Sequence, residues 1–134
     1  MDDILTRLKC FSAFFGVVLG WLFGDENYIL CVLIAFVIID YITGVLLAIY
    51  EKKLSSDIGY KGISKKAMIF LLVAVGNLLD KYIIGSGSSI RTMLIMFYIA
   101  NEGISISENA GKMGLPLPQK LKDILAQLHS KDDK

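Results

Sequence analysis

The stretch that decides the fold is residues 28–50, YILCVLIAFVIIDYITGVLLAIY. Its only charged side chain is Asp40, and it is apolar on every helical face. A helix needs about 20 apolar residues to cross the roughly 30 Å hydrocarbon layer of a bilayer. A soluble domain seldom buries a helix on all sides, because one face of such a helix normally meets water. This stretch therefore predicts a transmembrane helix.

Three further apolar stretches lie at residues 10–24, 67–84 and 92–106. The first and the last are short for a full crossing and need lipid thinning or protein contacts. The first follows basic residues, but it ends in WLFGDEN without the small residues of a signal-peptidase site, so no cleavage is expected. We predict an all-α integral membrane protein with about four short transmembrane helices, with three as the alternative.

Twelve of the 14 basic residues mark one side of the membrane, and the other two, Lys81 and Arg91, flank the turn at residues 85–89. Arg7 and Lys9 precede the first stretch, and lysines cluster between the second and third stretches and again after the fourth. The connection at residues 25–27 has none. Because basic loops stay in the cytoplasm, four crossings with both termini cytoplasmic fit this pattern. The expected location is the bacterial cytoplasmic membrane, with a transmembrane domain at residues 1–112 and a cytoplasmic tail at 113–134.

The tail predicts an amphipathic helix. Residues 114–118, GLPLP, separate it from the fourth stretch. Apolar residues then recur at helical spacing between charged ones; they are Leu117, Leu121, Ile124, Leu125 and Leu128. The pattern leaves two placements open, on the lipid surface or paired with another tail.

Small residues recur every four positions in the first stretch and again after Asp40 in the second. Such stripes let helix backbones approach closely in lipid. We expect these positions to pack helices or to hold protomers together. They are Ser12, Gly16, Gly20, Gly24, Gly44 and Ala48.

Polar side chains interrupt the apolar stretches. An isolated carboxylate at mid-membrane costs about 2.5–3.5 kcal/mol on insertion scales, so Asp40 is expected to be neutral and bonded to Asn77. Asp80 and Arg91 are expected to form an ion pair across the turn at residues 85–89, and Glu102 to pair with Lys65 or Lys66. The candidates for lining a pore are Asp40, Thr43, Asn77, Asp80, Arg91, Asn101 and Glu102.

The sequence lacks the residue patterns that metal sites and cysteine-based catalytic sites require. Cys10 and Cys31 have neither CxxC spacing nor histidine neighbours, and His129 is the only histidine. We therefore expect no metal, no cofactor and no catalytic residue. A net charge of +1 gives no field for nucleic acid, so no nucleic-acid partner is expected.

Four motifs resemble those of a known family. They are DYITG at residues 40–44, SSDIGYKG at 55–62, NEGISISEN at 101–109 and GLPLP at 114–118. In this order and spacing they resemble the toxin-secretion and phage-lysis holins, a group that includes clostridial toxin-release holins. The resemblance covers roughly residues 25–128.

The resemblance implies a non-enzymatic protein that collects in the cytoplasmic membrane, associates with itself and opens lesions. Through such lesions an endolysin leaves the cell and lyses it, or a large toxin is released. The sequence leaves two alternatives open. One is an antiholin or membrane scaffold that regulates a holin, and the other is a small ion-coupled transporter subunit, although no inverted repeat is visible.

Overall fold

The computed structural model describes residues 1–24 and 28–132, with side chains as far as residue 128, and all regular elements within these ranges are helical. The elements in chain order are α1 (Asp2–Phe23), α2 (Tyr28–Tyr50), α3 (Ser56–Leu78), the π-helical turn η1 (Leu79–Ile84), α4 (Ser89–Lys112) and α5 (Gln119–Asp132). The all-helical class predicted from the sequence is confirmed.

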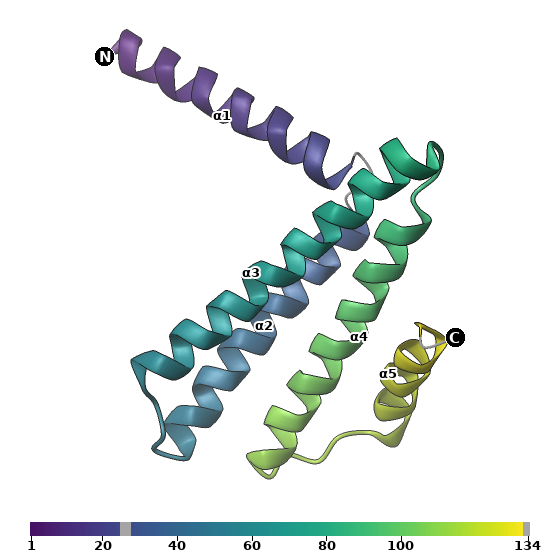
Figure 1. Cartoon of the computed structure of the whole chain (residues 1–134). Coiled ribbons are helices and arrows are strands. Elements are labelled where there is room, and N and C mark those ends of the chain that lie inside the picture. Colours follow the sequence, from purple (N-terminus) through teal and green to yellow (C-terminus); the bar gives the residue numbers. More distant parts are fainter. Residues whose placement is uncertain (25–27, 133–134) are drawn as a thin grey trace.

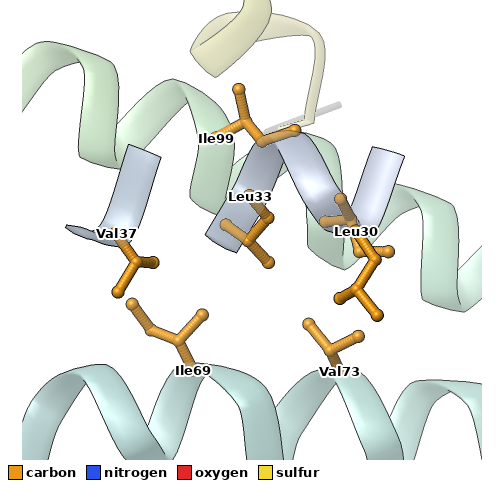
Figure 2. Packing of buried hydrophobic residues seen from close by; sticks show 7 residues of the cluster. Leu30, Leu33, Val37, Ile69, Val73 and Ile99 are labelled. Carbon is orange, nitrogen blue, oxygen red and sulfur yellow. The ribbon is translucent and has the colours of Figure 1, made fainter. Parts of the chain in front are cut away.

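Helices α2, α3 and α4 run side by side as a three-helix bundle (Figure 1). Its core is made of branched aliphatic side chains. Leu30, Leu33 and Val37 of α2 face Ile69 and Val73 of α3, and α4 closes the core (Figure 2). Lipid is as apolar as these side chains, so close packing and polar contacts must hold the bundle together in a membrane.

Two glycines let α4 approach its neighbours. A Cβ at Gly76 of α3 would lie 2.6 Å from Leu94 of α4. A Cβ at Gly103 of α4 would lie 2.6 Å from Leu125 of α5 and 3.3 Å from Phe36 of α2. The predicted small-residue stripes include neither glycine, although Gly103 begins a four-residue repeat with Ser107 and Gly111.

The observed helices are longer than the predicted apolar stretches, except for α2, whose bounds are those predicted. Helix α3 begins at Ser56 and not at residue 67, because the Ser55 hydroxyl accepts a hydrogen bond from the Ile58 N–H (3.3 Å) and caps the helix. Likewise α1 begins at Asp2, and α4 runs from Ser89 to Lys112. Hydropathy marks only the part of a helix that suits lipid, so polar helical ends escape it.

Three helical segments are long and apolar enough to cross a membrane, namely α1, α2 and the continuous run Ser56–Ile84 of α3 and η1. Within the described residues, α4 is not among them, although it has 24 residues. Its polar residues lower its hydropathy, and two charged ones, Arg91 and Glu102, are buried within the bundle. The first three predicted crossings thus have a matching segment.

Helix α1 leaves the bundle at a wide angle, while α5 folds back beside α4 (Figure 1). None of the residues of α1 is buried. In α5, Leu125 is buried against α4, while Leu121 and Ile124 remain 41% and 46% exposed. In this structure the C-terminal helix therefore packs on its own chain, an arrangement that differs from both placements considered from the sequence.

Candidate functional site

The first polar site is a cluster in which α2, α3 and α4 meet, which we call the carboxylate–lysine cluster. It consists of Asp40, Thr43, Lys66, Glu102 and Asn109. The Lys66 ammonium lies between two carboxylates, bonded to Asp40 Oδ2 and, at 2.6 Å, to Glu102 Oε2. Asp40 and Glu102 are each only 6% exposed.

Asn109 completes the cluster from the next turns of α4. Its Nδ2 donates to Asp40 Oδ1 (3.2 Å) and to Thr43 Oγ1 (2.9 Å). The Thr43 hydroxyl in turn donates to the backbone carbonyl of Asp40 (3.0 Å). Both Asp40 oxygens therefore have a donor, which is what a buried carboxylate requires.

The cluster corrects one prediction and confirms another. The predicted Asp40–Asn77 contact is wrong, because α3 begins at Ser56 and so places Lys66 at the level of Asp40. Asp40 is also not the isolated carboxylate for which a neutral state is predicted, because it forms an ion pair with Lys66. The predicted pairing of Glu102 with a lysine at the start of the third stretch is confirmed for Lys66.

A cavity of about 740 Å³ leads to the cluster from the end of the bundle that carries the α2–α3 turn. Asp40, Lys66 and Asn109 are among its lining residues. So are Gly44 and Ala48, two of the predicted packing positions. The cluster is thus buried among helices but borders on open space on one side.

The second polar site lies where α1 ends, and we call it the α1 cap. The last four carbonyls of a helix have no partner within it. Here Asn77 Nδ2 donates to the carbonyls of Trp21 (3.1 Å) and Leu22 (2.9 Å), and Arg91 Nε donates to the carbonyl of Phe23. Asn77 and Arg91 therefore tie the end of α1 to α3 and α4.

Gly24 belongs to this cap. Its φ of 84° is a left-handed conformation, and a Cβ there would lie 3.0 Å from Asn77 Oδ1. Gly24, the last residue of the predicted glycine stripe, is therefore the C-cap of α1. Gly16 and Gly20 differ, since nothing lies within 4 Å of a Cβ built on either.

Asp80 and Arg91 meet across the turn, as predicted, but in a different way. The Asp80 carboxylate, 1% exposed, accepts hydrogen bonds from the backbone N–H groups of Ile90 (3.0 Å) and Arg91 (2.8 Å). It therefore caps the N-terminus of α4, where a negative charge also suits the helix dipole. The expected ion pair is replaced by carboxylate-to-backbone hydrogen bonds.

Two further candidates, Asn101 and Ser12, belong to neither polar site. Asn101 is half-buried on α4 and makes no side-chain hydrogen bond to another residue in the described part of the chain. The Ser12 hydroxyl donates to the Leu8 carbonyl of its own helix (2.8 Å). In the described ranges, no group of three or more His, Cys, Asp or Glu side chains is placed to hold a metal ion.

Sequence comparisons give these sites a family context. The family model of the bacteriophage holin family matches residues 17–130. An uncharacterized 14.9 kDa protein in the nagH 3'region of Clostridium perfringens is 39% identical over 131 residues, covering 98% of this chain and 99% of its own. An uncharacterized protein of Listeria innocua is 44% identical over 111 residues, covering 83% and 79%.

A phage protein is also among the similar proteins. The probable holin of Bacillus phage phi105 is 37% identical over 114 residues, which cover 85% of this chain and 83% of that protein. No solved structure matches the chain. The match of the family model over most of the chain and the similarity to these full-length relatives show that the chain belongs to the bacteriophage holin family.

Proposed function

We propose that this protein is the holin of a lysis or toxin-release system, which associates with itself in the bacterial cytoplasmic membrane and forms lesions. The single observation that carries this proposal, beside the family, is the state of α1. This helix is apolar enough to cross a membrane, yet it buries no residue against its own bundle. Its glycine face at Gly16 and Gly20 is open, as a contact between protomers requires.

The proposed topology has four crossings with both termini in the cytoplasm. Helix α4 is the fourth crossing, with Arg91 and Glu102 turned into the bundle. Residues 1–112 then form the transmembrane domain, and residues 113–134 form a cytoplasmic tail. Support comes from the lysines at the α2–α3 turn and after α4, which four crossings place on the cytoplasmic side.

The carboxylate–lysine cluster gives the lesion a source of polar lining. Lipid cannot satisfy these groups, so they must bond to one another or meet water. In the separate protomer they bond to one another. We propose that crowding separates α2 from α3 along the cavity between them, and that Asp40, Lys66 and Glu102 then line water. Lesions built of many protomers would be wide enough for an endolysin or a large toxin to pass.

Inducible expression in a bacterium tests the function. A voltage-sensitive dye reports depolarisation, and a large cytoplasmic enzyme in the medium reports lesions. We expect growth to stop abruptly, together with both signals. Asp40→Leu should shift the time of onset, and Ile39→Leu, at a 44% exposed neighbouring position, is the matched control.

Two results would contradict the proposal. A chain that is harmless alone but delays lysis by a second membrane protein would be an antiholin. Saturable transport of an ion without release of the enzyme would indicate a transporter subunit. An Asp40→Leu onset equal to that of Ile39→Leu would remove Asp40 from the mechanism while leaving the function in place.

A further inference from the structure

A second cavity, of about 960 Å³, lies in the angle between α1 and the end of the bundle that carries η1. Cavities that hold small molecules have volumes of about 300–1,000 Å³, so this one is large enough for a substantial part of an amphiphile. Its α1 wall is the glycine face that the proposed function gives to contacts between protomers, so a lipid bound there and a second protomer would compete for it.

The two walls of this cavity differ in chemistry. One wall is α1, where Ala13, Gly16, Val17 and Gly20 present an apolar surface. The two glycines leave room along it, because no atom lies within 4 Å of a Cβ built on either. An acyl chain fits against such a wall, since it needs apolar surface and no hydrogen bonds.

The other wall is basic and polar. It includes Lys81, Arg91, Asn77 and the serines of the turn at residues 85–88. Among the described residues, no acidic side chain lines the cavity. The Asp80 carboxylate nearby is already bonded to the backbone N–H groups of Ile90 and Arg91. Since Asn77 and Arg91 already donate to carbonyls at the end of α1, the groups that this wall offers to a phosphate are the Lys81 ammonium and the serine hydroxyls.

Aromatic residues mark the rim of the cavity. Trp21 Nε1 donates to the Tyr82 hydroxyl (2.7 Å), and the Lys81 ammonium lies 5.5 Å from the centre of the Tyr82 ring. Tryptophan and tyrosine gather at the level of lipid headgroups in membrane proteins. The basic wall therefore lies at the depth where a lipid phosphate is found.

We propose that this cavity binds one anionic phospholipid, with its phosphate at Lys81 and the serine turn and an acyl chain along the glycine face of α1. Basic pockets between membrane helices bind anionic headgroups in this way. The bound lipid fills the angle between α1 and the bundle, which side chains of the described part of the chain leave open. This proposal holds whether or not the protein forms lesions.

The chain carries its own reporter for this site, because Trp21 is the only tryptophan and lines the cavity. The full chain is reconstituted in vesicles of phosphatidylcholine with a fixed fraction of phosphatidylglycerol. Bromine, which quenches tryptophan fluorescence, is placed on one lipid or on the other. Surface charge is then identical in the two samples, and only the quencher differs.

We expect brominated phosphatidylglycerol to occupy the site about fivefold more readily than brominated phosphatidylcholine, the factor that one lysine near a membrane surface provides. Lys81→Gln should bring the preference close to one, while Lys65→Gln, at an exposed lysine near the other end of the bundle, should leave it unchanged. Gly20→Leu should fill the cavity and reduce quenching by both lipids. Gly111→Leu, where a Cβ also meets nothing within 4 Å, is its control.

Equal quenching by the two lipids in the unmodified chain would overturn the proposal. So would a preference that survives both Lys81→Gln and Gly20→Leu. Inorganic phosphate is added as a competitor, and we expect no displacement. If millimolar phosphate abolished the preference, the site would be one for free phosphate and not for a lipid.

Discussion

At the scale of single residues, Lys66 matters most, because one ammonium serves two buried carboxylates. Removing one partner of a buried ion pair leaves an uncompensated charge and costs about 3–5 kcal/mol. We therefore expect Lys66→Met to lower the free energy of unfolding in mixed detergent micelles by about that amount.

The neutral triple variant Asp40→Asn, Lys66→Met, Glu102→Gln is the informative control, since it removes every charge of the cluster at once. It should recover most of the stability that Lys66→Met loses, because no charge is left buried without a partner. If the triple variant were as unstable as Lys66→Met, shape and not charge would explain the loss.

Asn77 helps to hold the end of α1 against the bundle. Without its amide, the carbonyls of Trp21 and Leu22 lose their donors, at a cost of about 1–3 kcal/mol. We expect Asn77→Ala to free α1 from the bundle. The natural cysteines Cys10 on α1 and Cys31 on α2 are both exposed and take spin labels directly.

The distance distribution between labels on these two cysteines should be narrow in the unmodified chain and broad in Asn77→Ala. Asn101→Ala is a suitable control, because it removes an asparagine that is not part of the α1 cap. An unchanged distribution in Asn77→Ala would mean that Arg91 and the chain connection alone hold α1.

At the scale of elements, the sequence predicted the helices and the pairing of Glu102 with a lysine, but not the other polar contacts. The bounds of α2 follow from its sequence, because it is apolar from end to end. The start of α3 depends on the Ser55 cap, and only that start brings Lys66 level with Asp40. The Asn77 cap and the close approach at Gly76 depend on which helices meet, and no repeat in the sequence reveals this. Gly103 begins a four-residue repeat with Ser107 and Gly111, so its packing role could have been predicted.

Among the α5 side chains that the structure describes, Leu125 is the buried one. Leu125 is 7% exposed and packs on Gly103, whereas Ile124 beside it is 46% exposed. We expect Leu125→Ala to release α5 from α4 and to speed tryptic cleavage after Lys120 and Lys122. Ile124→Ala removes a similar volume from an exposed position and should leave the cleavage rate near that of the unmodified chain.

At the scale of the whole molecule, the topology decides what the two polar sites can do. If α4 crosses the membrane, the carboxylate–lysine cluster lies nearer the cytoplasmic side and the α1 cap nearer the outer side. The cavity next to Asp40 and Lys66 then borders on the cytoplasm. Water could then reach the polar side chains of the cluster from the cytoplasmic side when the helices separate.

Single cysteines in a chain carrying Cys10→Ser and Cys31→Ser test this topology in intact cells. Ser86→Cys, in the turn between η1 and α4, should react with a membrane-impermeant maleimide added outside. Ser56→Cys, at the start of α3, and Gln119→Cys, at the start of α5, should react only after permeabilisation, because four crossings keep both in the cytoplasm. Ready labelling of Gln119→Cys from outside would mean that α4 does not cross. The lysine-bearing tail would then lie outside, against the distribution of basic residues.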